Sequence, residues 1–256
     1  MSTRPHAEPA SIWTQPEPGA RKPRLSRARI ARAALRLADA EGLEAASMRR
    51  VASALGAGTM TLYHYVRTRE DLLALMEDAL MGETLVRRLP THWRDALAAI
   101  ARKTRAVFVR HPWVMGSMSH AAMGPNAVRH VEQSLAALAT TSLDGAAKIE
   151  VLSLVDDFVF GHALRASNGA HEGAAELARS PRAAGPHIDA LARDVQAWKK
   201  VHGARRSGEA FERGLDALLA GIADRFVDRT RRGRSRGKNV SPRARPTPRR
   251  RTRAPR

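Results

Sequence analysis

Apolar residues recur at every third or fourth position through most of this chain, which is the period of an amphipathic α-helix. In residues 26–42 the recurring positions are Ile30, Ala33, Ala34, Leu37 and Ala38. Gly42 follows them and is typical of a residue at which a helix ends. Residues 68–83 repeat the apolar pattern and open on a threonine and an aspartate in the order of a capping box. Both segments are predicted to be helices, and they flank a more distinctive stretch.

That stretch is residues 47–66, SMRRVASALGAGTMTLYHYV, which predicts two short helices joined by a turn. Ser47 is placed to cap the first helix with its hydroxyl, and Gly56 and Gly58 bracket the turn. The second helix carries hydroxyl and aromatic side chains, which suit base edges and phosphate oxygens. This order is typical of a DNA-reading helix-turn-helix. Two packed helices of an ordinary α-bundle are the alternative.

The pattern stays helical through residues 71–228, and no segment alternates in the manner of a strand. Helices are expected at residues 91–110, 125–139, 145–166 and 207–228. The third of these is apolar around nearly its whole circumference except at Asp156, Asp157 and His162, so it has to be buried on more than one side. An all-α fold is therefore predicted.

Residues 26 to about 80 resemble the DNA-binding domain of the TetR family of bacterial repressors. The resemblance rests on the alanine-rich first helix, the R-x-V-A-x-x-L-G run, the L-Y-x-Y/H-V segment and the charged step into D-L-L. It implies an N-terminal three-helix helix-turn-helix DNA-binding domain followed by a helical ligand-binding and dimerisation domain. It also implies a homodimer that binds a palindromic operator.

Family positions carry over one at a time. Arg49 matches an arginine that reaches a base, and its guanidinium could grip guanine through two hydrogen bonds. Arg69 matches a phosphate-binding residue. For Tyr63, packing between helices is the alternative to DNA contact. The full set of expected DNA-binding residues is Ser47, Arg49, Thr59, Met60, Thr61, Tyr63, His64, Tyr65 and Arg69.

The resemblance continues more loosely into the second half, through HPW, a GPN turn and FERGLDALLAGI. It implies that helices 145–166 and 207–228 pack with their mates from a second subunit. The expected dimer contacts are Leu152, Val155, Val159, Leu215, Leu218, Leu219 and Ile222.

A pocket for a small-molecule effector is expected in the same domain. Its candidate lining residues are Trp113, Met115, Met118, His120, Phe158 and His162, with ordinary core packing as the alternative for each. Tetracycline is not the expected ligand, because Thr84 or Leu85 stands where the drug-binding branch has a histidine. No metal and no cofactor are expected.

An enzymatic role is not expected either. Asp156 and Asp157 are neighbours on a helix and so point to different sides, and no nucleophile, phosphate loop or metal motif accompanies them. Dimer contacts or a cationic ligand are the remaining roles for these aspartates.

Charge divides the chain further. The formal net charge is +19, yet residues 71–228 are neutral, and residues 229–256 hold 13 basic and no acidic residues. We expect a disordered arm at 1–24, a DNA-binding domain at 25–70, a ligand-binding and dimerisation domain at 71–228 and a disordered arginine-rich tail at 229–256. The tail could add salt-sensitive affinity for DNA phosphates or serve only as a solubilising extension. It lacks the apolar anchors of a membrane-bound helix.

The chain has no cysteine, and no apolar run is long enough for a signal peptide or a membrane span. We therefore expect a cytoplasmic, ligand-responsive DNA-binding regulator that acts as a repressor. The effector would alter the separation of the two reading helices. The alternative is an architectural protein that binds DNA largely without regard to sequence through its basic tail.

Overall fold

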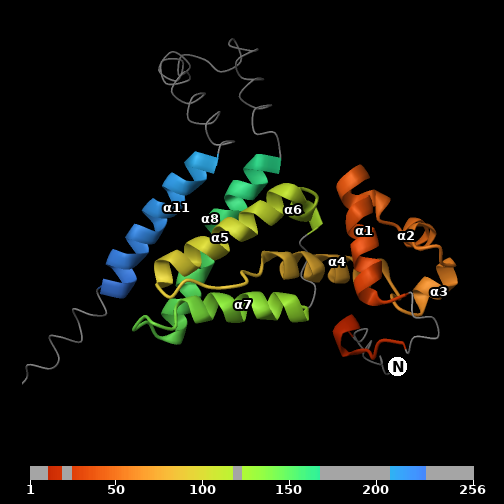
Figure 1. Ribbon diagram of the computed structural model, residues 1–256, viewed down its shortest axis with the longest axis horizontal. Helices are drawn as coiled ribbons and strands as arrows, with labels where there is room; N and C mark the ends of the chain where they lie inside the picture. The colour runs from red at the N-terminus through yellow and green to blue at the C-terminus, as the bar shows by residue number, and fades with distance from the viewer. Residues whose placement is uncertain (1–10, 19–24, 118–122, 168–207, 229–256) are drawn as a thin grey trace, which may run out of the picture.

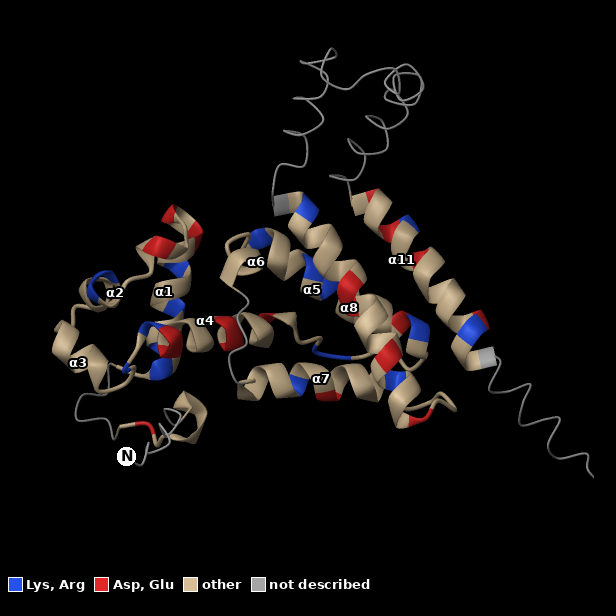
Figure 2. Cartoon of the chain, turned by 180° about the vertical axis from the view of Figure 1, so that it is seen from behind, with Lys and Arg blue, Asp and Glu red and all other residues tan. Residues whose placement is uncertain are grey.

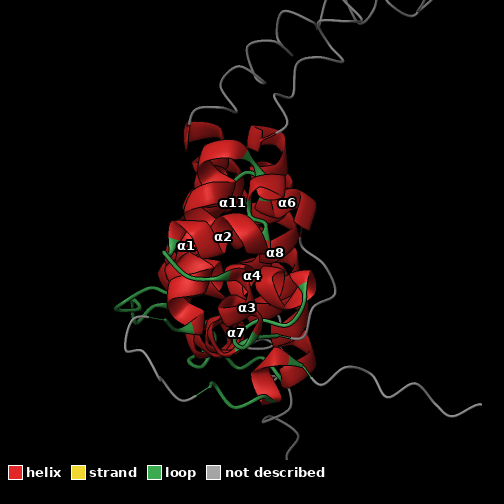
Figure 3. Ribbon diagram, turned by 90° about the vertical axis from the view of Figure 1, so that its right-hand side faces the viewer, coloured by secondary structure: helices red, strands yellow, loops and turns green. Residues whose placement is uncertain are grey.

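The computed structural model describes residues 11–18, 25–117, 123–167 and 208–228, and within these ranges every regular element is helical (Figure 1, Figure 3). The all-α prediction is confirmed. The expected arginine-rich tail lies outside the described residues, as does the stretch between residues 168 and 207. Every helix within the described ranges is too short or too polar to cross a lipid bilayer.

Three helices form the N-terminal unit: α1 (Arg27–Glu41), α2 (Met48–Ala54) and α3 (Thr59–Tyr63), with a 3-10 turn, η2 (Leu43–Ala45), between the first two. The hydroxyl of Ser26 accepts from the backbone N–H of Arg29 and caps α1. Gly42 ends α1 with φ 87°, a value that side chains with a Cβ rarely adopt. Local sequence chemistry therefore places both ends of this helix.

Helix α4 (Arg69–Thr84) connects the N-terminal unit to the rest of the molecule (Figure 1). Thr68 caps it by accepting from the N–H of Asp71 at 3.0 Å, as the capping-box order predicts. Its first half buries Leu72, Leu75 and Met76, and the helix packs against α1 as well as α5 and α7. One continuous helix thus belongs to both halves of the molecule.

The C-terminal half consists of α5 (Trp93–Arg110), α6 (Val114–Ser117), α7 (Pro125–Ala137), α8 (Gly145–Ser167) and α11 (Gly208–Ile222). A π-helical turn, η5 (Ala223–Asp228), extends α11. Helix α5 packs along α8, and two salt bridges tie it to α11. These pair Arg94 with Asp216 and Arg102 with Glu212.

The hydrophobic core has two clusters. One lies between α5, α8 and α11 and includes Leu97, Val151 and Phe211. The other joins the N-terminal helices to the ends of α5 and α8, where Phe108 and Ala163 are buried. The N-terminal unit therefore shares its core with the C-terminal half rather than closing a core of its own.

Part of the expected disordered arm is ordered, which differs from the prediction for residues 1–24. Residues 11–18 include a 3-10 turn, η1 (Ile12–Thr14), and Ile12 is buried in the first core cluster. The guanidinium of Arg27 donates to the backbone carbonyls of Ile12 and Gln15 at 3.1 and 2.9 Å. A proline-rich segment was expected to lack enough apolar surface to fold, but a core formed by other helices can bury one isoleucine from it. Residues 1–10 and 19–24 lie outside the described residues.

A polar cluster joins α1 to the end of α5 and the start of α6. The Asp39 carboxylate lies 2.5 Å from Nδ1 of His111, and the indole N–H of Trp113 donates to it at 2.8 Å. His111 is only 5% exposed, and Nε of Arg110 donates to its other ring nitrogen at 3.0 Å. Arg110 also pairs with Glu83 of α4. Asp39 is the only contribution of α1 to this cluster among the described contacts, so it joins the two halves.

We expect Asp39→Ala to lower the free energy of unfolding by about 1–3 kcal/mol, because it leaves a buried histidine and an indole N–H without their acceptor. Urea denaturation monitored by circular dichroism would measure the loss. Asp95→Ala is the matched control, because Asp95 is exposed and its ion pair with the His92 ring is long, at 3.7 Å. Equal stabilities of the two variants would contradict a structural role for Asp39.

Candidate nucleic-acid interface and effector cavity

A helix cap, a glycine turn and a buried leucine hold the corner between α2 and α3 in place. Ser47 caps α2 by accepting from the N–H of Arg50 at 3.4 Å, so its hydroxyl already has a structural use. Gly56 turns the chain with φ 62°, and the N–H of Ala57 bonds back to the carbonyl of Ala52 at 3.0 Å. Leu62 is completely buried beneath α3. The orientation of α3 is therefore set by the core and by the glycine turn.

The opposite side of α3 faces solvent. Met60 is 75% exposed and Tyr63 is 42% exposed. Thr61 and His64 are also exposed, whereas Thr59 is half-buried at the start of the helix. Arg49 on α2 is also exposed. Helix α3 itself carries no charged residue (Figure 2). We call Arg49, Met60, Thr61, Tyr63 and His64 the reading face.

Tyr65 does not belong to the reading face, which is a correction to the sequence prediction. Its side chain is 8% exposed and packs in the first core cluster. Its backbone carbonyl accepts from Nε of Arg27 at 3.1 Å. Tyr65 lies three residues after Leu62 and therefore on the same, inward side, whereas Tyr63 points outward. The two tyrosines have opposite environments despite their proximity in sequence.

In this structure Arg69 forms a salt bridge with Glu44 of the same chain. Its Nη2 lies 2.9 Å from the Glu44 carboxylate, which is 89% exposed. Exposed ion pairs contribute little net free energy, so a phosphate could replace this carboxylate at small cost. Arg50, one residue after the predicted Arg49, pairs with Glu41 at 2.5 Å.

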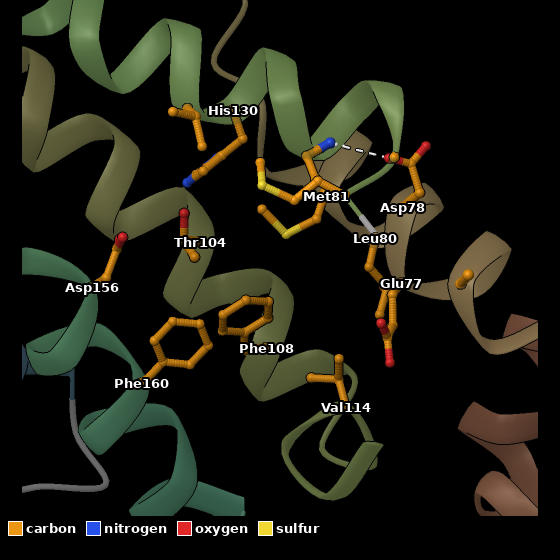
Figure 4. A pocket seen from close by; sticks show the side chains of 15 residues that line it. Glu77, Asp78, Leu80, Met81, Thr104, Phe108, Val114, His130, Asp156 and Phe160 are labelled. Atoms are coloured by element: carbon orange, nitrogen blue, oxygen red, sulfur yellow. Dashed lines mark hydrogen bonds between the residues drawn. The ribbon is translucent and has the colours of Figure 1, made fainter. Parts of the chain in front are cut away.

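A second candidate site is a cavity of about 270 Å³ that lies between α4, α5, α6, α7 and α8 and is open to solvent on one side (Figure 4). Its walls are mainly apolar, with a small number of polar side chains. The lining residues are Ala74, Glu77, Asp78, Leu80, Met81, Thr104, Phe108, Val114, Met123, Gly124, Ala127, His130, Val131, Asp156 and Phe160.

The expected lining residues that the structure describes, Trp113, Met115, Phe158 and His162, do not line this cavity. Trp113 bonds to Asp39, and Met115 packs against the first core cluster. The rings of Phe158 and His162 contact each other in a tilted arrangement, with centroids 4.5 Å apart, and both contact Phe211. Met118 and His120 lie outside the described residues. One signal was present in the sequence: Asp156, which interrupts an apolar helix, lies at the cavity.

The residues expected at a dimer interface are mostly buried within the subunit. Leu152, Val155, Val159, Leu215, Leu219 and Ile222 form part of the second core cluster, and Leu218 is half-buried against it. The large apolar side chains that α8 exposes are Ile149, Leu154 and Leu164. The apolar pattern correctly predicted that α8 and α11 are packed helices, but it did not predict which face of each helix is covered within the subunit.

Two hydrogen bonds of Thr84 determine which ring nitrogen of His130, in the cavity wall, carries the proton. The Thr84 hydroxyl donates to the carbonyl of Met81 at 2.7 Å, and it lies 2.8 Å from Nδ1 of His130. Because that hydroxyl has one proton, Nδ1 must donate to it, which leaves Nε2 as an acceptor. Burial lowers the pKa of His130, so the ring is neutral near pH 7.

The cavity carboxylates differ in their bonding. Asp78 is 6% exposed and accepts from the N–H groups of Asn126 and Ala127, at 2.8 and 3.1 Å, at the start of α7. Its charge is therefore used to hold α7 against α4. Asp156 is exposed on α8, yet desolvation by the surrounding protein, and secondarily the charge of Asp157, raise its pKa to about 6. Figure 4 shows Asp156 and Glu77 on opposite sides of the cavity.

Two family models match this chain. One, described as bacterial regulatory proteins, tetR family, matches residues 30–76, and the other, described as tetracyclin repressor-like, C-terminal domain, matches residues 88–226. An HTH-type transcriptional regulator from Saccharopolyspora erythraea is 34% identical over 229 residues, which are 84% of this chain and 92% of that protein.

Further similarity is found among repressors and solved structures. The HTH-type transcriptional repressor DrrR1 of Streptomyces coeruleorubidus is 40% identical over 145 residues, which are 56% of this chain and only about half, 54%, of that protein. Apo ActR from Streptomyces coelicolor superposes with a TM-score of 0.61 at 28% identity, covering 78% of this chain and 95% of ActR. ActR in complex with actinorhodin gives a TM-score of 0.60 at 29% identity, covering 79% and 97%.

The raised pKa of Asp156 predicts a pH-dependent stability difference. Its charged form is disfavoured in the folded chain, so the wild type loses stability as the pH rises from its ordinary pKa of 3.8 through about 6. Asp156→Asn avoids this loss and should be more stable than the wild type by about 1 kcal/mol above pH 7, an amount reduced by solvent screening. The two proteins should converge below the ordinary pKa.

Thermal unfolding across this pH range would measure the difference. Asp224→Asn removes an exposed carboxylate outside the cavity and controls for net charge. A difference between Asp156→Asn and wild type that stays constant with pH would contradict the raised pKa.

Proposed function

Because this chain belongs to the TetR family of bacterial transcriptional regulators, we propose that it is a ligand-responsive repressor. It binds a palindromic operator as a homodimer and is released when a small-molecule effector enters the cavity. The reading face is the observation that carries this proposal. Its orientation is fixed by buried residues, while its own side chains stay exposed.

The chemistry of the reading face suits a major groove. Arg49 offers the paired donors that guanine accepts, and the side chains of Met60 and Thr61 suit thymine methyl groups and base edges. Tyr63 and His64 offer hydrogen bonds to phosphate oxygens, which fix the register on the duplex. Helix α3 is only five residues long and reads few bases, so two copies on a palindrome are needed for a specific site.

The proposed dimer interface uses the outer faces of α8 and α11. Helix α8 exposes Ile149, Leu154 and Leu164, and α11 exposes the small residues Ala217 and Ala220. Small residues allow two helices to approach closely, and the aliphatic side chains supply apolar area. The residues that the sequence placed at the interface, such as Leu152 and Leu215, lie instead in the core beneath these outer faces.

Helix α4 links the cavity to the reading face. Asp78 and Met81 line the cavity, while Leu72 and Met76 of the same helix are buried in the core shared with α1. A ligand that displaces α4 therefore moves the N-terminal unit and changes the separation of the two reading faces in the dimer. ActR, which has a similar structure, has been solved with actinorhodin bound, and this supports a small-molecule effector here.

Operator recognition is tested by footprinting the full chain on the DNA upstream of its own gene at physiological salt. We expect a discrete palindromic protected site, and Met60→Ala should weaken its occupancy by about tenfold, the cost of a lost base contact. Val128→Ala is the control, because Val128 is also exposed, at 42%, and lies on α7 outside the cavity lining.

Protection spread evenly over the DNA and unchanged by Met60→Ala would reject operator recognition. That result would favour the architectural alternative, in which binding depends on charge rather than on the reading face.

The dimer interface gives an independent prediction. Ile149→Arg places a charge on the most exposed large apolar residue of α8, so it should convert the dimer to monomer in sedimentation equilibrium and abolish the footprint. Val128→Arg on α7, where the valine is 42% exposed, should leave both unchanged. A dimeric Ile149→Arg protein would show that the interface lies elsewhere.

A further inference from the structure

The polar groups at one side of the cavity are hydrogen-bond acceptors. Thr104 is 5% exposed, and its Oγ1 has no hydrogen-bond partner in the structure. Asp156 supplies a carboxylate, and His130 is left with Nε2 as an acceptor because Nδ1 bonds to Thr84. Figure 4 shows these three side chains, from α5, α8 and α7, on the same side of the cavity. A ligand that donates hydrogen bonds can satisfy all three of these groups, although the Thr104 hydroxyl can also donate.

The charged side chains among the described residues that line the cavity are acidic. No lysine or arginine is found among the described residues that line it, whereas Glu77, Asp78 and Asp156 are all acidic. Asp78 already accepts from the start of α7. Asp156 therefore opposes an anionic ligand and favours a cationic one.

The remaining wall is suited to an aromatic body. Phe108 and Phe160 stack with centroids 5.2 Å apart and face the cavity (Figure 4). Met81 and Leu80 close the side formed by α4. Flat ring systems gain from contact with phenylalanine rings and with methionine sulfur.

We propose that the effector is a protonated amine carried on an apolar aromatic body, with Asp156 as its counter-ion and the Thr104 hydroxyl as an acceptor for the ammonium. This inference rests on the proposed function, because it assigns a chemical class to the effector of the same cavity. The ammonium donates hydrogen bonds that the oxygens of Asp156 and Thr104 and Nε2 of His130 can accept. The aromatic body contacts Phe108 and Phe160.

Three probes that share one aromatic body test the charge selectivity. They are naphthylethylamine, its neutral N-acetyl derivative and the anion naphthylacetate, each titrated by calorimetry into the full chain without DNA. We expect the amine to bind about tenfold or more tightly than the neutral derivative, since a hydrogen bond to a charged group is worth about that much. The anion should not bind measurably.

Variants then locate the selectivity. Asp156→Asn should bring the amine to the affinity of the neutral derivative. Asp157→Asn, on the same helix but outside the lining, should retain the preference and is the matched control. Thr104→Val preserves the side-chain shape, removes the hydroxyl and should weaken amine binding.

Two results would overturn the assignment. If the neutral derivative or the anion binds as tightly as the amine, the cavity holds ligands but has no preference for a cation. If none of the three binds, the cavity does not take aromatic amines at all. In both cases the operator footprint is measured without ligand, so the proposed DNA-binding function stands or falls separately.

Discussion

Helix α4 packs against α1 on one side and against α5 and α7 on the other, so it joins the N-terminal unit to the C-terminal half. It is capped at Thr68, buries Leu72, Leu75 and Met76 toward the N-terminal unit, and then lines the cavity with Asp78 and Met81. A continuous helix transmits a displacement along its length because its backbone hydrogen bonds resist bending. The proposed coupling between the cavity and the reading face rests on this helix.

Two hydrogen-bonded carboxylates, the buried Asp78 and the more exposed Asp39, reinforce this arrangement. Asp78 holds the start of α7 against α4, and Asp39 holds the buried His111 and the Trp113 indole against α1. Buried polar groups stabilise a structure when all their bonds are made, and they are costly when a partner moves away. The positions of α1, α4 and α7 are therefore specified by directional bonds as well as by apolar contact.

Side-chain exposure and unsatisfied hydrogen-bonding groups distinguish the candidate sites from the core. The reading face is exposed because Leu62 and Tyr65 take the inward positions of its segment. The cavity retains polar groups such as Thr104 Oγ1 because no neighbouring protein atom satisfies them. Both features are departures from complete packing and complete hydrogen bonding, and such departures are common at binding sites.

The sequence alone determined the helices, their caps and the helix-turn-helix, because capping residues, glycines and apolar period act over a few residues. It could not decide which partner covers each apolar face. Tertiary packing buried Leu152 and Leu215 inside the subunit, turned Tyr65 inward and ordered Ile12 on a core formed by other helices. It also gathered Thr104, His130 and Asp156 from three helices around one cavity. Such groupings depend on contacts between distant segments, which local periodicity does not encode.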